Sequence, residues 1–216
     1  MTPLQEKVDK SIIELNASEI AVNGKKVQLD ELELIQEKHK LDFEETQDYR
    51  HGIVSFTAEI EANSVIALST HLRRLTRLRP KQPIRIEFNC NGGTINHGLH
   101  LIDDITVIGK ECPITIAVRG QAASMGAVIL QAAQKRLVGP CSYIMLHRAS
   151  FGVEGSADDV EDSVKEVQMF EKRIYEIIAK RTGKTVEFWK KQLGRRKDVW
   201  YTADEAVKIG LADGIG

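Results

Sequence analysis

From residue 52 onwards, short apolar runs alternate with longer segments of helical periodicity, and this alternation limits the possible folds more than any other feature. Strand-like runs occur at residues 53–56, 84–88 and 114–118, where β-branched side chains are frequent. Segments of about ten to fifteen residues with helical spacing separate them. Strands alternating with helices in this way are typical of α/β proteins. We therefore predict an α/β fold.

Capping and stop signals delimit the next elements of the chain. In order, we expect a helix from Asn63 to Arg79, a helix from about Asn96 to Ile108, a helix running to about Gln134, and short strands at residues 137–138 and 143–146.

A long helix dominates the C-terminal part of the predicted fold. Ser156 is its expected cap, and apolar side chains at helical spacing continue to about Gly183. A helix of this length exceeds the usual globular range, so we expect it to project or to pack between subunits. After it we expect a short helix at 185–193, a connector at 198–202, and a last helix that opens on the capping box at 202–205 and ends at Gly210.

Residues 1–50 differ from the rest of the chain. They contain twelve acidic against seven basic side chains, and Asn23-Gly24 is a strong hairpin signal between two helical patterns. We interpret them as a charged appendage of helix, hairpin and helix, because such charge runs usually face solvent. The predicted domains are therefore this appendage, 1–50, and the α/β domain, 51–216.

Composition narrows the function classes. The net charge of −1 gives no reason to expect nucleic acid or an anionic membrane as partner. The apolar runs fall short of the roughly 20 residues that span a bilayer, and the polar N-terminus does not resemble a secretory signal. The three cysteines, Cys90, Cys112 and Cys141, lack metal-type spacing, which indicates reduced thiols in a cytoplasmic protein.

The stretch from Gly120 to Ala127 places Ser124 between small residues, where a strand is expected to turn into a helix. Such a corner leaves room for a substrate and brings backbone N–H groups close to the hydroxyl. This is the local chemistry of an activated serine nucleophile. The same spacing also occurs at ordinary tight turns, so the interpretation requires a base, an orienting acid and oxyanion donors elsewhere.

Among the six histidines, His147 alone follows a strand downstream of the serine, where open α/β sheets build their sites. The others lie in the appendage, before a strand or on helices: His39, His51, His71, His97 and His100. The residues alone do not choose among four candidate acids, Asp158, Asp159, Asp198 and Asp204. Gly92-Gly93, between a strand and a helix, can expose N–H groups to an oxyanion or can form a simple turn.

Taken together, three motifs in this order resemble the proteolytic subunit family of the Clp peptidases: Asn89-x-x-Gly92-Gly93, the octapeptide Gly120–Ala127, and Tyr143–His147. The similarity continues through the long helix to the Thr202–Asp213 segment and covers roughly residues 52–213. It implies that Ser124 is the nucleophile, His147 the general base and Asp198 the orienting acid. It also implies an oxyanion hole formed by the backbone N–H groups of Gly93 and Met125.

The resemblance further implies a spiral fold of ββα units shared with crotonases, with the long helix joining stacked rings. Family members form heptameric rings, paired around a closed chamber, and an ATP-driven unfoldase feeds them unfolded chains. The implied activity is that of a serine endopeptidase acting on unfolded proteins or peptides in a homo-oligomer. The peptidase step needs no metal, nucleotide or other cofactor.

Three departures from the family pattern bear on this expectation. Cys90-Asn91 replaces the usual Ser-Pro, which should loosen the turn that aims Gly93 and adds an oxidisable thiol near the cleft. Arg148-Ala149 replaces the usual Gln-Pro after the base, and residues 1–50 do not resemble the family's unfoldase-docking segment. These departures are consistent with a phage or prophage maturation protease or a stand-alone peptidase. The competing hypotheses are a non-catalytic ring or scaffold subunit and a crotonase-type acyl-coenzyme A enzyme.

Overall fold

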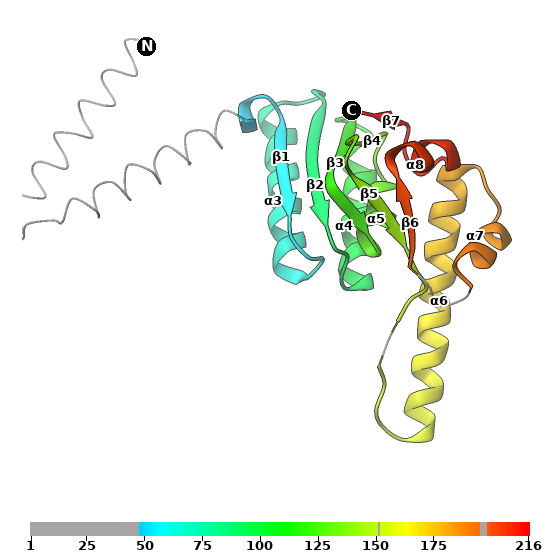
Figure 1. Ribbon diagram of the computed structural model, residues 1–216. Helices are drawn as coiled ribbons and strands as arrows, with labels where there is room; N and C mark the ends of the chain where they lie inside the picture. Colours follow the sequence, from blue (N-terminus) through cyan, green and yellow to red (C-terminus); the bar gives the residue numbers. More distant parts are fainter. Residues whose placement is uncertain (1–47, 151, 195–197) are drawn as a thin grey trace, which may run out of the picture. The chain divides into compact units, whose positions relative to one another are not determined.

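A computed structural model describes residues 48–150, 152–194 and 198–216 of the chain (Figure 1). The predicted appendage lies almost entirely outside these residues, so its helix, hairpin and helix stay predictions, as does the domain boundary at residue 50. Element labels follow Figure 1 and begin at β1 and α3.

The structure confirms the α/β class. In chain order the elements are β1 (Ile53–Thr57), α3 (Ala62–Leu78), β2 (Ile84–Cys90), α4 (Ile95–Ile108), β3 (Ile114–Ala123), α5 (Met125–Leu130), β4 (Lys135–Val138), β5 (Tyr143–Leu146), α6 (Ala157–Thr182), α7 (Val186–Leu193), β6 (Val199–Thr202), α8 (Ala203–Ile209) and β7 (Gly214–Ile215).

The sheet has a parallel path in the order β1-β2-β3-β4-β7, from which β5 and β6 branch. The branch arises because β3 is long enough to pair twice: its first half pairs with β4, and its last residues, Gln121–Ala123, pair in parallel with β5. β6 then runs antiparallel to β5. This change of partner along β3 brings the carboxyl ends of β3 and β5 together.

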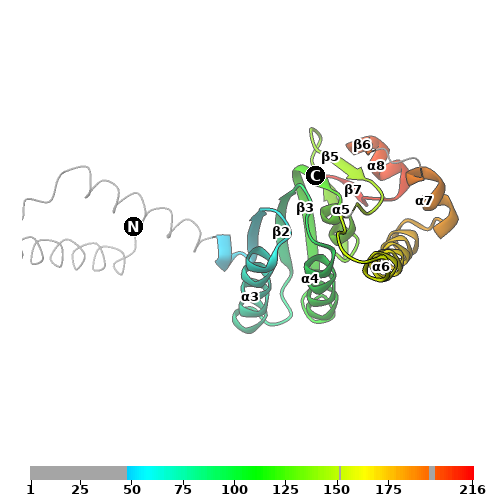
Figure 2. The ribbon, with the colours of Figure 1, turned by 90° about the horizontal axis from the view of Figure 1, so that it is seen from below.

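Helices α3 and α4 lie side by side on one face of the sheet, as Figure 2 shows. Their buried faces carry aliphatic side chains such as Leu72 and Ile105, which are fully buried. Between β1 and β2, the rings of Phe56 and Phe88 stack at 5.4 Å. Burial of aliphatic and aromatic side chains of this size typically contributes about 1.5–3 kcal/mol each, so this layer supplies much of the stability.

Several predicted element boundaries are wrong. The connector expected at 198–202 is mostly strand β6, and β7 was not expected at all. α3 begins earlier than Asn63, because Ser64 accepts from the N–H of Glu61 and makes Glu61 the cap. α5 ends at Leu130 rather than near Gln134, because Gln134 already exchanges hydrogen bonds with Ile114 on β3.

The prediction for α6 is confirmed: Ser156 accepts from Asp159 N–H in a capping box, and the helix runs 26 residues to a left-handed Gly183. Only its C-terminal half packs on the core, through Tyr175, Ile178 and Ala179. The N-terminal half extends away from the sheet (Figure 1). It carries partly exposed apolar side chains, among them Met169 at 60%.

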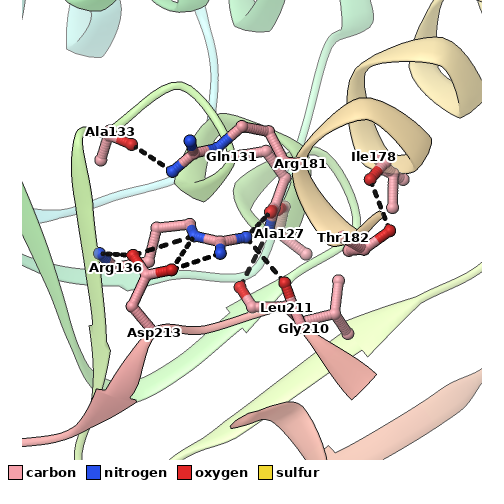
Figure 3. Close-up of polar contacts among 10 residues, drawn as sticks. All are labelled: Ala127, Gln131, Ala133, Arg136, Ile178, Arg181, Thr182, Gly210, Leu211 and Asp213. Atoms are coloured by element: carbon pink, nitrogen blue, oxygen red, sulfur yellow. Dashed lines mark hydrogen bonds and ion pairs between the residues drawn. The ribbon is translucent and has the colours of Figure 1, made fainter. Parts of the chain in front are cut away.

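A buried arginine ties the C-terminal elements to the end of α5 (Figure 3). Arg136 forms an ion pair with Asp213, donates to the Gly210 carbonyl at 2.8 Å, and donates to the side chain of Gln131 at 2.6 Å. Gln131, the C-cap of α5, in turn donates to the Leu211 carbonyl at 3.2 Å. Although burial alone opposes it, hydrogen bonds from Arg136 hold the pKa of the Asp213 carboxyl below its usual range. This network anchors the short helix that follows Ser124.

Candidate active site

Ser124 lies at the corner between β3 and α5 with φ 53° and ψ −122°, a backbone region that favours glycine. Its N–H donates to the Met145 carbonyl at 2.9 Å, which holds the corner against β5. A serine in such a sparsely populated region costs of order 1–3 kcal/mol and persists only when its surroundings impose it. The nucleophilic serines of α/β-hydrolases occupy strained strand-to-helix turns of the same kind.

His147 follows the last residue of β5 and contacts the serine directly. Its Nε2 lies 2.7 Å from Ser124 Oγ, and its Nδ1 lies 2.5 Å from the backbone carbonyl of Arg148. Because a carbonyl oxygen only accepts, Nδ1 carries the proton, and Nε2 is then free to accept from the serine hydroxyl. The parallel pairing of Ala123 with Met145 explains why the two side chains emerge at the same edge.

Asp198 lies next to the same edge of the sheet. It immediately precedes β6, and since Val199 pairs with Leu146, continuing the register places Asp198 opposite His147. Its side chain is exposed, and among the residues that the structure describes it makes no hydrogen bond with His147.

Among the described residues, none of the other candidate acids and histidines forms a hydrogen bond with Ser124. Asp159 accepts from Ser156 at the start of α6, and Asp158 and Asp204 lie exposed in the first turns of α6 and α8. His71 packs its ring edge-on against Tyr49, and His100 lies 3.4 Å from Asp104. Within the described ranges, neither His51 nor His97 forms a hydrogen bond with Ser124, and His39 lies outside these ranges.

The Gly92-Gly93 turn packs against the serine and requires glycine at both positions. Their φ angles are 106° and 142°, and a Cβ on Gly92 would lie 2.6 Å from Ser124 Cβ. A Cβ on Gly93 would lie 2.4 Å from the carbonyl oxygen of Ile60. The Ile60 carbonyl accepts a hydrogen bond from the N–H of Thr94. The N–H of Gly93 has no acceptor in the part of the chain described. Met125 is the first residue of α5, so its N–H has no partner within the helix.

Cys90, which we expected to be an oxidisable thiol near the cleft, is buried. Its Sγ is buried beside Gly126 and accepts from the N–H of Gly92 at 3.3 Å, so the thiol takes part in the turn. Burial raises the pKa of Cys90 to about 11, which keeps it protonated near neutral pH. Asn91 adds a contact to the side chain of Gln121 on β3.

A pocket opens beside the Ser124–His147 pair. Apolar side chains from four elements form part of its wall: Ile95 of α4, Met125 and Val128 of α5, Leu146 of β5, and Ile174 of α6. Gly93, Ala149 and Ser150 complete the lining. Its apolar side chains can hold a hydrophobic group of a substrate next to the paired serine and histidine.

No helix within residues 48–150, 152–194 and 198–216 is both long and apolar enough to cross a membrane. Over the same residues, no cluster of three or more histidine, cysteine or acidic side chains is placed to hold a metal ion.

The fold and site define a class of α/β protein that pairs a strained serine with a histidine at neighbouring strand ends. Comparison with known proteins identifies the family. The family profile described as Clp protease matches residues 37–216. The chain is also 35% identical over 166 residues to ATP-dependent Clp protease proteolytic subunit 1 of Chlamydia abortus (strain DSM 27085 / S26/3), covering 75% of this chain and 84% of that protein. The chain belongs to the Clp protease family, as its motifs predicted, and the match begins within the predicted appendage.

Proposed function

We propose that this protein is a serine endopeptidase that hydrolyses peptide bonds of unfolded proteins or peptides. Membership of the Clp protease family supports a peptidase role. The observation that carries the serine mechanism is the 2.7 Å contact between Ser124 Oγ and His147 Nε2, with Nδ1 bonded to a carbonyl. This arrangement has the tautomer that a general base requires.

In the first half of the reaction, Oγ of Ser124 attacks the substrate carbonyl carbon as its proton passes to Nε2 of His147. The negative charge on the substrate oxygen is proposed to lie against the N–H groups of Gly93 and Met125, and one such donor is typically worth about 3 kcal/mol. Collapse of the intermediate breaks the C–N bond, and His147 returns the proton to the leaving amine. Water then hydrolyses the acyl-serine ester by the same route in reverse.

Asp198 is the proposed orienting acid, and its place opposite His147 in the β5–β6 register supports this role. Its carboxylate would accept from Nδ1 when the imidazolium forms and would stabilise that charge. Asp198→Asn should then slow peptide turnover, but by a factor several orders of magnitude smaller than the factor caused by Ser124→Ala. It should change folding little. Unchanged kinetics in Asp198→Asn would assign the role to another group.

We also propose that the chain assembles into a homo-oligomeric ring or stacked double ring in the cytoplasm. Several apolar side chains are exposed on the N-terminal half of α6. They support an interface there, because exposed apolar side chains that lie together mark interaction sites. The relative from Chlamydia abortus is named as ATP-dependent, which supports an ATP-driven unfoldase as partner. The peptidase steps proposed above use no cofactor.

Hydrolysis of a fluorogenic peptide and of an unstructured protein tests the proposed activity. Wild type and the exposed-serine control Ser55→Ala should cleave equally, because Ser55 lies on β1 away from the site. Ser124→Ala should show no cleavage while keeping the native mass of wild type. An assembled wild-type particle that cleaves neither substrate would support a scaffold subunit, and binding of coenzyme A would support a crotonase-type enzyme.

A further inference from the structure

The base is held by the peptide unit that follows it. Nδ1 of His147 lies 2.5 Å from the carbonyl oxygen of Arg148, so the orientation of that carbonyl decides whether Nδ1 has an acceptor. This carbonyl belongs to an exposed connection between β5 and the segment leading to α6. A short exposed connection has many accessible backbone conformations, and an anchor is needed to favour one of them.

The side chain of Arg148 supplies such an anchor. Its Nε and Nη2 donate to the two carboxylate oxygens of Glu171 at 3.2 and 3.1 Å, which is a bidentate fork. Glu171 is on α6 and its side chain is only 14% exposed, whereas that of Arg148 is 45% exposed. The bond to Glu171 raises the pKa of the Arg148 guanidinium, and the Tyr175 hydroxyl lies close to the same group.

The ion pair joins the catalytic edge to the long helix. One helical turn beyond Glu171, Ile174 lines the pocket, and Ala149 and Ser150, which follow Arg148, line it as well. The same face of α6 therefore contributes Ile174 to the pocket wall and Glu171 to the ion pair with Arg148. A partly exposed ion pair adds little to global stability, typically about 0–1 kcal/mol. Its fork geometry, however, restricts orientation more than a single hydrogen bond does.

We propose that Arg148 and Glu171 are positioning residues: their ion pair fixes the peptide after His147, so that the Arg148 carbonyl serves as an acceptor for Nδ1 beside Asp198. This inference rests on the proposed function, in which His147 is the base. It assigns a role to a position where the chain departs from the family pattern. One consequence is that the base keeps an acceptor for Nδ1 when the Asp198 carboxylate is absent.

The test measures kcat, KM and the rate of fluorophosphonate labelling in the full-length chain. Glu171→Gln and Arg148→Ala should lower kcat and the labelling rate roughly tenfold, within the usual range for coupled side chains, and should leave KM within about twofold. The loss caused by Glu171→Gln should be larger in an Asp198→Asn background, because the Arg148 carbonyl is then the remaining acceptor. A purely structural role would not make the loss depend on Asp198.

Glu176→Gln is the matched control, because Glu176 lies on the same helix and pairs with Arg173 at 3.7 Å on an exposed surface. It should behave as wild type. The reversed pair, Arg148→Glu with Glu171→Arg, should recover a substantial part of kcat, and this recovery also guards against simple misfolding of the single variants.

Wild-type rates in Glu171→Gln, or an equal loss in both backgrounds, would overturn this inference while leaving the peptidase assignment intact. A wild-type protein that neither labels nor cleaves would instead overturn the proposed function, and this inference with it.

Discussion

At the scale of single residues, the geometry around Ser124 depends on glycine. Gly92 has a positive φ, and a Cβ there would lie 2.6 Å from Ser124 Cβ and 3.1 Å from its Oγ. Contacts under about 3 Å between such atoms cannot be kept, so either the turn or Ser124 must move. The absence of a side chain at Gly92 thus allows the turn to approach Ser124 closely.

Gly92→Ala should therefore remove most of the fluorophosphonate labelling and lower the free energy of unfolding by about 1–3 kcal/mol, from overpacking and backbone strain. Denaturant unfolding and labelling kinetics measure the two effects. Gly152→Ala is the control, because a Cβ at Gly152 meets nothing within 4 Å. Full labelling in Gly92→Ala would contradict the described approach of the turn to the serine.

The strained backbone of Ser124 leads to a second residue-scale prediction. Glycine adopts φ near 53° at little cost, whereas alanine does not. Both Ser124→Gly and Ser124→Ala should be inactive, but Ser124→Gly should be the more stable by about 1 kcal/mol. Chemical denaturation of the two variants compares them directly. Equal stabilities would indicate that the serine backbone is not strained.

At the scale of elements, the Arg136 network holds the C-terminal end of α5, the short helix that follows Ser124. Arg136 is 4% exposed and reaches Asp213, Gly210 and Gln131, which joins β4, the C-terminal segment and the end of α5. A buried guanidinium without its carboxylate partner is costly, so Asp213 matters more to stability than its own partial exposure suggests.

Asp213→Asn should lower the free energy of unfolding at pH 7 by about 2 kcal/mol, the usual value for a hydrogen bond to a charged group. Since the pKa of Asp213 is lowered on folding, its contribution is present above the unfolded pKa of about 4 and is lost as pH falls through the folded pKa. Unfolding measured from pH 7 to pH 3 should show the two proteins converging at low pH. Asp103→Asn, on the exposed face of α4, should match wild type throughout. A constant difference between wild type and Asp213→Asn would contradict the assignment.

Some parts of the fold and site could be predicted from the sequence because their signals are local. The strands and helices up to β5, the Ser156 cap and the Ser124 corner each follow from neighbouring residues. β6 was not predicted because a four-residue strand is defined by its pairing with β5 rather than by its composition. The Arg136–Asp213 and Arg148–Glu171 pairs join residues 77 and 23 positions apart, and no local pattern indicates them. Asp198 came from the family resemblance alone.

At the scale of the whole molecule, α6 is a helix whose N-terminal half leaves apolar side chains exposed. Val160, Val164 and Met169 are 38%, 37% and 60% exposed on its N-terminal half, where little of the chain's own core covers them. Burial of such side chains against a second copy would stabilise an assembly by roughly 25 cal/mol per Å² of apolar area. The proposed ring therefore depends on this half of the helix.

Val164→Asp should lower the native mass, because a carboxylate at an apolar interface is desolvated without a partner. Light scattering coupled to gel filtration measures the mass, and circular dichroism should show an intact fold. Glu161→Asp, an exposed acidic change on the same helix, should keep the wild-type mass. An unchanged mass in Val164→Asp would place the subunit interface elsewhere.

The proposed serine mechanism is tested most directly by identifying the atom that reacts with a serine-directed probe. The full-length protein is treated with a fluorophosphonate, and intact-mass and peptide-mapping mass spectrometry locate the adduct. We expect one adduct per chain, on Ser124, which disappears in His147→Ala as well as in Ser124→Ala. An adduct on another residue, or a folded and assembled protein that forms none, would contradict it.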